Sequence, residues 1–430
     1  MKPQLAVVTL LAAITAMVLL WDPSEDIRER RSGQQPVSLQ VRTPAKKTSA
    51  RKTSAAKTTF DPHVRVNLTN APVAKVQITV DGPFVVTPIG SSRVLFQAKR
   101  FSAATISLTA AGFRFGTVNL PTSRIEIVPE QSPSVWVGEH QYRGRIRLHR
   151  RQGGRFTVVN VLPLEEYIAS VVDSEMPAAF PNAARRAQAI VARTYALYQM
   201  TSGTRHPLFD LFDGTRSQKY LGYKYRNSKG RLLAGETKAG QRIARETAGV
   251  VCTHAGRVFC TYYSAVCGGS TTEGKQVFTD AAPPLRSVTC NWCREAKRYR
   301  WSARLSKKQV LESLRPLFSN RESFGPLRSV TQLPSTKNSG QAVYLVDDGR
   351  SQHRVSAIEF RRRLPAGTLN SPHFDIRDDG ADLVFDGRGH GHGVGLCQWG
   401  ARGQGLAGRT CVQILAHYYP GSTVVVLESS

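Results

Sequence analysis

Acidic residues are scarce in this 430-residue sequence: 31 Asp and Glu stand against 59 Lys and Arg, for a formal net charge of +28. The shortage of negative charge argues against a cationic partner. It favours an anionic one, such as nucleic acid, an anionic lipid or a cell-wall polymer. The same charge also fits a protein whose surface is merely rich in arginine. No recognised nucleic-acid-binding motif is visible, so we expect no nucleic acid among the partners.

One long apolar run near the start of the chain, from Leu5 to Trp21, contains no charged residue. The run is long enough for a short membrane-spanning helix and also fits the apolar region of a signal peptide. No small-x-small cleavage pattern follows Leu20. We therefore interpret residues 1–21 as a retained membrane anchor in preference to a cleaved signal peptide. Either interpretation predicts that the rest of the chain is exported to the periplasmic or cell-wall side, where it stays anchored to the cytoplasmic membrane or is secreted.

Residues 22–70 are interpreted as a basic, disordered linker. No acid occurs from Arg30 to Phe60, where eight Lys and Arg are interspersed with Ser, Thr, Ala, Pro and Gln. Such a stretch cannot bury enough apolar surface to offset the entropy lost on ordering. It is either a plain spacer or a tether that also binds an anionic wall or membrane surface.

The next segment is rich in predicted strands but lacks any catalytic constellation. Val76–Val80 alternates strictly between apolar and polar residues, and Asp81-Gly82-Pro83 then supplies a turn. Further short apolar runs continue to about residue 160. We expect a small β-rich module over residues 72–144 with no chemistry of its own.

The clearest helical pattern follows Pro163. Apolar residues recur with the period of one buried helical face, at Leu164, Tyr167, Ile168, Val171 and Val172. Pro163 suits the first helical position, and Pro177 prevents continuation. Glu175 is therefore expected at a helix-ending turn beside apolar groups, either as a functional acid or as an ordinary solvated residue.

A second helix is predicted from a cap at Asn182 to about Met200. Gln188 and Arg193 are polar residues within this Ala-rich segment. The following stretch, residues 209–220, mixes aromatic, amide and hydroxyl side chains. That mixture suits a carbohydrate-binding surface, and it equally suits a structured loop.

Four sequence blocks, in this order, carry a specific resemblance: Tyr167–Pro177, Ala187–Ala196, Ser217–Tyr220 and Gly387–Ala401. Together with the ending His417–Gly421 they resemble the SpoIID/LytB family over about residues 145–425. The resemblance implies an α+β fold. Its SpoIID-type catalytic domain would span residues 145–430, with the small β-rich module N-terminal to it or inserted in it.

The family includes lytic transglycosylases and amidase enhancers. The resemblance implies that Glu175 is the catalytic acid and base, cleaving the bond between muramic acid and glucosamine in glycan strands that have lost their peptides. It also implies a substrate groove lined by Gln188, Arg193, Ser217, Gln218, Tyr220, His392 and Gln398. The alternative is a wall-binding protein without catalysis that assists a cell-wall amidase. Peptidoglycan strands are the expected partner in both cases.

Seven cysteines occur, all in the second half of the chain: Cys252, Cys260, Cys267, Cys290, Cys293, Cys397 and Cys411. The Cys290-x-x-Cys293 pair and the upstream Cys267-Gly-Gly segment suit tetrahedral zinc, with Cys260 as the fourth thiolate. Some relatives carry His where this chain has Tyr263, which weakens a direct transfer of ligands. Disulfides and free thiols remain alternatives in an exported protein. We expect at most one structural zinc ion and no organic cofactor.

Overall fold

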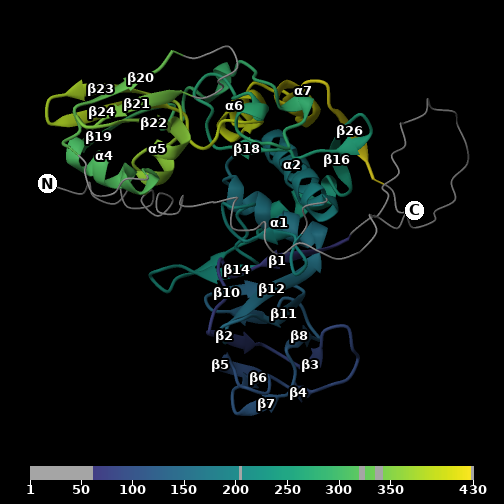
Figure 1. Ribbon diagram of the computed structural model, residues 1–430. Helices are drawn as coiled ribbons and strands as arrows, with labels where there is room; N and C mark the ends of the chain where they lie inside the picture. The colour runs from purple at the N-terminus through teal and green to yellow at the C-terminus, as the bar shows by residue number, and fades with distance from the viewer. Residues whose placement is uncertain (1–61, 203–205, 319–324, 335–341, 428–430) are drawn as a thin grey trace, which may run out of the picture. The chain divides into compact units, whose positions relative to one another are not determined.

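The computed structural model describes residues 62–202, 206–318, 325–334 and 342–427 (Figure 1). The predicted anchor, residues 1–21, and most of the predicted linker lie outside the described residues. Within the described ranges, no helix combines the length and apolar character needed to cross a membrane. The described residues form two compact units, an N-terminal unit of residues 62–261 and 422–427, and a C-terminal unit of residues 262–421. Helices and strands are mixed in both units, which confirms the predicted α+β class.

The N-terminal unit contains two large sheets. The first has the order β13-β1-β12-β11-β8-β3-β4; its strands are β1 (His63–Asn67), β3 (Phe84–Pro88), β4 (Phe96–Ala98), β8 (Arg124–Pro129), β11 (Arg145–Arg150), β12 (Phe156–Pro163) and β13 (Leu211–Phe212). The second has the order β15-β14-β10-β9-β2-β5-β6-β7; its strands are β2 (Lys75–Val80), β5 (Phe101–Leu108), β6 (Phe113–Phe115), β7 (Val118–Leu120), β9 (Val135–Val137), β10 (His140–Tyr142), β14 (Lys224–Arg226) and β15 (Leu232–Ala234). The predicted strand at Val76–Val80 is confirmed as β2.

Strand β1 corrects the predicted end of the linker. It lies within residues 22–70, yet it pairs antiparallel with β12 and parallel with β13. Val64 and Val66 are completely buried in the sheet. The alternation of these two valines with polar residues is a strand pattern too short to stand out beside a long basic run. The folded part of the described chain therefore includes β1, from His63 onward.

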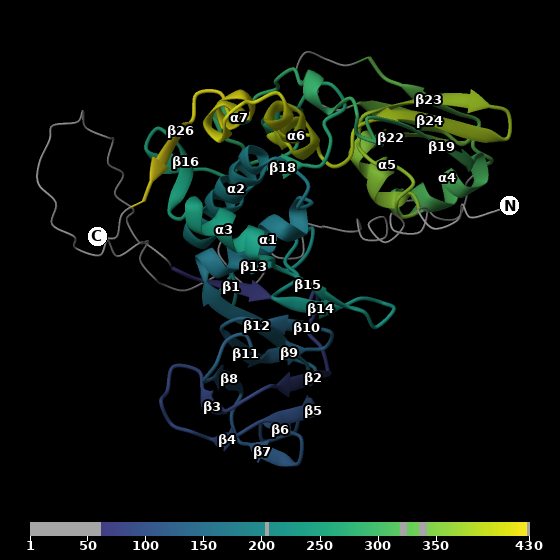
Figure 2. The same ribbon diagram turned by 180° about the vertical axis from the view of Figure 1, so that it is seen from behind.

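Three helices continue the N-terminal unit, α1 (Leu164–Glu175), α2 (Asn182–Thr201) and α3 (Lys238–Glu246). Figure 2 shows all three at one end of the two sheets, and Figure 1 shows α1 and α2 there. Strand β12 runs directly into α1, whose buried face contains every apolar position that the periodicity predicted. The predicted caps need adjusting, because Pro163 and Pro181 are the N-cap residues and Asn182 is already helical. A three-stranded sheet of β17 (Arg257–Val258), β16 (Val250–His254) and β26 (Thr423–Val426) completes the unit.

The C-terminal unit contains two further three-stranded sheets and four helices. The sheets have the orders β19-β24-β23 and β20-β21-β22; the strands are β19 (Arg300–Ser306), β20 (Ser329–Gln332), β21 (Val343–Asp347), β22 (Gln352–Ser356), β23 (Phe374–Asp379) and β24 (Asp382–Arg388). The helices are α4 (Lys307–Leu314), α5 (Ala357–Arg363), α6 (Gln398–Leu406) and α7 (Cys411–Tyr418). The apolar faces of α4 and α5 share one core with these sheets, which includes Tyr344, Phe360 and Phe385.

The glycine-rich block after β24 folds back on the start of the same unit. Strand β25 (Leu396–Cys397) pairs in parallel with β18 (Tyr263–Ser264). The Cα of Gly395 lies so close to the residue before β18 that an added Cβ would be 2.0 Å from the Tyr262 carbonyl oxygen. The close approach explains why glycine recurs in this block, and it brings the chain around Cys397 beside the chain around Cys267.

Candidate active site

Glu175 is the last residue of α1, as the sequence predicted. The helix ends there because Met176 has extended backbone geometry and a completely buried side chain. The Glu175 carboxylate remains partly exposed, and its Oε1 accepts a hydrogen bond of 2.8 Å from the backbone amide of Lys219. A solvent-accessible carboxylate is thus fixed between the end of a rigid helix and the loop 213–220.

The loop 213–220 is held by its own backbone and by buried aromatic side chains. The Tyr220 amide donates to the Asp213 carbonyl oxygen at 2.9 Å. The Tyr220 hydroxyl donates to Asn160 Oδ1 at 2.8 Å, and the Tyr167 hydroxyl donates to Gln218 Oε1 at 3.1 Å. Burial raises the pKa of both tyrosines well above their usual range. They therefore stay protonated and act as hydrogen-bond donors that position the loop.

Asp213 is a second acidic group in this neighbourhood, and sequence reasoning gave it no role. Its charge and that of Glu175 both act on the Tyr167 hydroxyl. Burial raises the pKa of the Asp213 carboxyl to about 6. The signal that could have found it is an Asp-Gly turn within an aromatic loop, but loops of that composition are common.

The structure brings Ser217, Gln218 and Tyr220 close to Glu175, but in different roles from the one predicted. Gln218 and Tyr220 are almost completely buried and hold the loop from behind. Ser217 is partly exposed, and its Oγ accepts from the Phe212 amide at 3.1 Å. Of these predicted groove residues, Ser217 alone presents a partly exposed side chain on the loop.

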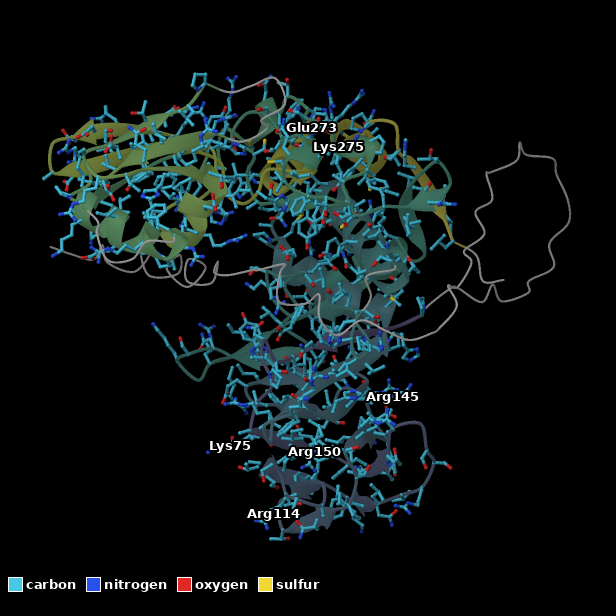
Figure 3. The ribbon with its side chains drawn as sticks, in the orientation of Figure 1. Lys75, Arg114, Arg145, Arg150, Glu273 and Lys275 are labelled. Carbon is cyan, nitrogen blue, oxygen red and sulfur yellow. The ribbon has the colours of Figure 1, made fainter. Side chains whose placement is uncertain are left out.

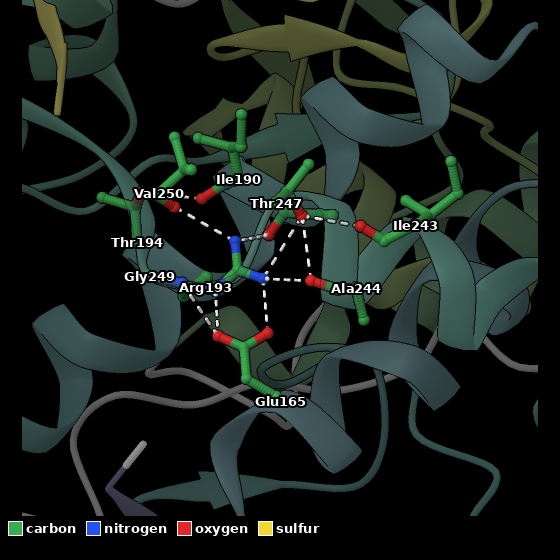
Figure 4. A network of polar contacts seen from close by, with 10 residues as sticks. Glu165, Ile190, Arg193, Thr194, Ile243, Ala244, Thr247, Gly249 and Val250 are labelled. Carbon is green, nitrogen blue, oxygen red and sulfur yellow. Dashed lines mark hydrogen bonds and ion pairs between the residues drawn. The ribbon is translucent and has the colours of Figure 1, made fainter. Parts of the chain in front are cut away.

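Gln188 and Arg193 lie inside the N-terminal unit and not at a surface, which corrects the expectation that they line a groove. Both side chains are completely buried. Arg193 binds both carboxylate oxygens of Glu165 at 2.7 and 2.6 Å, and it donates to the Val250 carbonyl oxygen at 3.0 Å (Figure 4). The physical reason is the ion pair: Glu165 of α1 makes the burial of a guanidinium on α2 tolerable. Arg193 therefore joins helices and does not reach solvent.

His392 and Gln398 belong to the C-terminal unit. The His392 ring packs edge-on against Phe278 and Tyr262, and its Nδ1 accepts from the Val394 amide at 3.1 Å. Burial and the nearby Arg361 lower the pKa of His392 to about 4, so the imidazole is neutral at pH 7. Gln398 is the first residue of α6 and is nearly buried.

Four cysteines of the C-terminal unit form one cluster: Cys267, Cys290, Cys293 and Cys397. Their Sγ atoms all lie within 4.8 Å of one another, and those of Cys267 and Cys293 are 3.6 Å apart. A tetrahedral zinc ion bound at about 2.3 Å by thiolates separates them by roughly 3.8 Å. All four side chains are buried, and the Cys290 Sγ also lies 3.2 Å from the Tyr418 hydroxyl. The residues present fit a structural zinc ion.

Cys397, and not the predicted Cys260, is the fourth member of this cluster. Cys260 belongs to the N-terminal unit, where its Sγ accepts from Gln199 Nε2 at 3.6 Å. Sequence proximity favoured Cys260, whereas the pairing of Ser264 with Cys397 in the β18–β25 ladder brings the distant residue in. No disulfide joins any of the seven cysteines in the described part of the chain, so the structure gives no support to the disulfide alternative. Hydrogen bonding to Cys267 lowers the pKa of Cys293, while burial raises that of Cys397.

Comparison with known proteins agrees with the sequence blocks. The profile of SpoIID, described as Stage II sporulation protein, matches residues 152–254. An uncharacterized protein of Brachyspira hyodysenteriae is 32% identical over 268 residues, which cover 62% of this chain and 68% of that protein. Stage II sporulation protein D of Bacillus subtilis is 27% identical over 270 residues, covering 62% and 75%. The amidase enhancer of Bacillus subtilis is 24% identical over 302 residues, covering 60% and 40%.

The matched profile spans the part of the N-terminal unit that carries Glu175. Residues 152–254 include β12, α1, α2, the loop 213–220 and the buried Arg193 network. The two Bacillus subtilis relatives carry the two names that the sequence blocks suggested. The similarity extends well beyond the profile, since each alignment covers at least 60% of this chain. We conclude that this chain belongs to the SpoIID/LytB family.

Proposed function

We propose that the protein is a peptidoglycan lytic transglycosylase in which Glu175 serves as both acid and base. The observation that carries the proposal is the position of the Glu175 carboxylate. It is partly exposed, it accepts a hydrogen bond from the Lys219 amide, and it lies at the end of a helix whose face from Tyr167 to Val172 is buried. A group that must give up and regain a proton at one sugar needs this combination of access and fixed position.

One carboxyl is sufficient for this reaction because the nucleophile belongs to the substrate. Glu175 donates its proton to the glycosidic oxygen between muramic acid and glucosamine, and the bond from that oxygen to C1 breaks. The C6 hydroxyl of the same muramic acid then attacks C1, and its proton returns to Glu175. The product carries a 1,6-anhydro ring and no water is consumed. Well-oriented intramolecular attacks reach effective molarities on the order of 10⁵ M or more, so a second carboxylate is not needed to activate water.

Charge supports a polyanionic cell-wall partner. Residues 62–160 contain 13 Lys and Arg against four Asp and Glu. Figure 3 labels four of the basic side chains around the sheets of the N-terminal unit, of which Lys75, Arg114 and Arg150 are exposed. Glycan strands without peptides carry a free carboxylate on each muramic acid, so such a surface attracts them over distances of about 10 Å at moderate salt.

A direct test compares two carboxamide variants. Glu175→Gln keeps the size of the side chain but cannot cycle a proton, so cleavage of peptide-free glycan strands should fall by roughly 10²–10⁴-fold. Glu246→Gln is the matched control, because Glu246 ends helix α3 of the same unit and pairs with Arg186 at the surface. It should cleave as the unmodified protein does. Equal rates for all three proteins would refute the assignment of Glu175.

The second candidate function is stimulation of a cell-wall amidase without cleavage by this chain. The relative named amidase enhancer favours it. This function predicts that the purified chain leaves glycan strands intact but raises the rate at which an added amidase releases peptides. Glu175→Gln would then stimulate the amidase as well as the unmodified protein does.

We further propose export of the chain and one structural zinc ion. The apolar run Leu5–Trp21 supports export, since peptidoglycan lies outside the cytoplasmic membrane. The four clustered sulfur atoms support zinc, held by Cys267, Cys290, Cys293 and Cys397. The zinc would join the glycine-rich block to the start of the C-terminal unit and would take no part in the reaction. Membrane fractionation and elemental analysis test these two proposals separately.

A further inference from the structure

The eight-stranded sheet of the N-terminal unit has one face packed in the core and one face of polar side chains. Ile78, Ile106 and Val135 point to the core and are completely buried. The residues that alternate with them point to the opposite face, which we call the platform. Its uncharged members include Gln77, Thr79, Thr105, Asn119, Trp136 and Gln141. Their amide and hydroxyl groups can hydrogen-bond to sugar hydroxyls, and nothing in the chemistry proposed for Glu175 uses them.

The platform also carries four basic residues without an acidic partner. These are Lys75, Arg114, Lys224 and Arg226, of which Figure 3 labels the first two. In the described ranges none of the four has a carboxylate within ion-pair distance. No strand residue on this face is acidic, and the acids at its strand ends are Glu139 and Asp81. The platform therefore has a net positive charge, which the ordinary polar face of an antiparallel sheet does not require.

Trp136 orients the side chain of Arg226. The indole Nε1 donates to Asp81 Oδ2 at 2.7 Å, which fixes the ring. The guanidinium carbon of Arg226, two strands away on the same face, lies 4.6 Å from the centroid of this ring. An arginine stacked on an aromatic ring keeps its N–H edge free and loses little further freedom when it binds a carboxylate. Arg226 is therefore pre-oriented for an anionic group.

The spread of the basic residues matches a polymer and not a small anion. They lie on β2, β6 and β14, and β14 is five steps from β6 in the order of the sheet. Adjacent strands are about 4.8 Å apart, so the basic residues extend over roughly 24 Å. A single sugar or simple anion contacts only one of them, whereas a linear polyanion contacts several at once.

One edge of the platform is attached to the loop that holds Glu175. Strand β14 follows this loop in the chain. The Ser170 hydroxyl of α1 donates to the Gly222 carbonyl oxygen at 2.8 Å, and the Tyr223 amide donates to the Gln141 carbonyl oxygen at 2.7 Å. Helix α1 and strand β10 thus hold the start of the β14–β15 hairpin, and the platform begins where the Glu175 loop ends.

We propose that the platform binds an acidic, linear glycan strand that continues from the Glu175 site. Carboxylates of the strand lie against Arg226 and the other basic residues, and sugar hydroxyls bind the amide and hydroxyl groups between them. In peptidoglycan these carboxylates are the lactyl groups of muramic acids whose peptides have been removed. The choice of peptidoglycan rests on the proposed function, whereas the binding of an acidic glycan does not.

The test measures binding by isothermal titration calorimetry to the full chain carrying Glu175→Gln, so that no ligand is consumed. The probes are peptide-free glycan strands, which carry carboxylates, neutral chitohexaose, and duplex DNA as a polyanion without pyranose rings. Lys224→Gln combined with Arg226→Gln should weaken binding of the glycan strands at least about tenfold, equivalent to roughly 1.4 kcal/mol. Chitohexaose binding should be unchanged, and DNA binding should fall by a smaller factor than glycan binding.

Arg93→Gln combined with Arg124→Gln is the matched control, because it removes the same charge from the other large sheet. Arg93 lies between β3 and β4, Arg124 lies on β8, and both are exposed. This control should bind the glycan strands as the parent does. None of the four substituted residues is buried, so both double variants should fold.

Three results would overturn the proposal: equal glycan binding by the two double variants, equal losses of glycan and DNA binding in the Lys224 and Arg226 variant, or no glycan binding by the parent. The second result would make the platform a general polyanion surface. Failure of the proposed function is seen separately, since glycan strands would then bind to the platform but stay uncleaved by the unmodified chain.

Discussion

Removing the guanidinium of Arg193 should destabilise the N-terminal unit more than any surface charge change. Its side chain is completely buried, and it binds Glu165 through two nitrogen atoms at 2.7 and 2.6 Å. It also donates to Val250, Ala244 and Thr247 at 3.0–3.3 Å, so that one side chain joins α1, α2, α3 and the strand β16 (Figure 4). Arg193→Met would leave a carboxylate and several acceptors without their donor.

The expected loss of unfolding free energy depends on how deeply Glu165, the partner of Arg193, is buried. Breaking a buried ion pair from one side costs about 3–5 kcal/mol. The Glu165 side chain is 17% exposed, so water can reach it in part. We therefore expect the low end, about 3 kcal/mol, for Arg193→Met. Adding Glu165→Leu should recover most of the loss, because the double variant replaces both charges with apolar groups.

Urea unfolding followed by circular dichroism measures this loss. The two units need not unfold together, so the transition assigned to the N-terminal unit is the one to compare. Arg186→Met is the control, because Arg186 makes a similar contact of 2.6 Å with Glu246 but at the surface. Exposed pairs of this kind contribute about 0–1 kcal/mol. If Arg193→Met costs no more than Arg186→Met, the network does not hold the helices together and the reasoning is wrong.

Three further predictions concern zinc, pH and the start of the fold. The purified chain should contain one zinc ion by elemental analysis. Cys397→Ser should lose this zinc, whereas Cys260→Ser should retain it. A lack of zinc in the unmodified chain would exclude the site. Folding raises the pKa of Asp213 from 3.8 to about 6, so the folded chain binds more protons than the unfolded chain in this window and loses stability as pH rises through it. Asp213→Asn should remove that slope and add about 1–3 kcal/mol at pH 7 in urea unfolding, whereas an unchanged slope would count against a buried carboxyl. A chain beginning at Val73 lacks β1 and should lose cooperative unfolding, while one beginning at Asp61 should keep the transition of the full chain; equal transitions would show that β1 is dispensable.

Local patterns predicted the elements around the site correctly. The apolar period after Pro163 and the stop at Pro177 placed Glu175 at the end of a helix, because both signals act within one or two turns of the chain. The same reasoning predicted strand β2 from strict alternation. These features depend on neighbours in sequence, which a single sequence displays directly.

Features that depend on distant pairing could not be predicted in the same way. Arg193 looked like a polar residue available to substrate because its partner Glu165 lies 28 residues away on another helix. Cys397 joins Cys267 through a ladder between segments 130 residues apart. Strand β1 is short, and its pairing with β12, which is distant in sequence, stabilises it more than its local residue pattern does. In each case the deciding contact is made by tertiary structure, which overrides local propensity.

The nature of the new chain ends tests the central claim most directly. Peptide-free glycan strands incubated with the purified full chain should be analysed by mass spectrometry, beside the same strands incubated with Glu175→Gln. The account predicts fragments that end in 1,6-anhydromuramic acid with the unmodified protein and almost none with the variant. Fragments that end in reducing sugars would contradict it, because they require attack by water and a second carboxylate that the one-carboxyl reaction does not use.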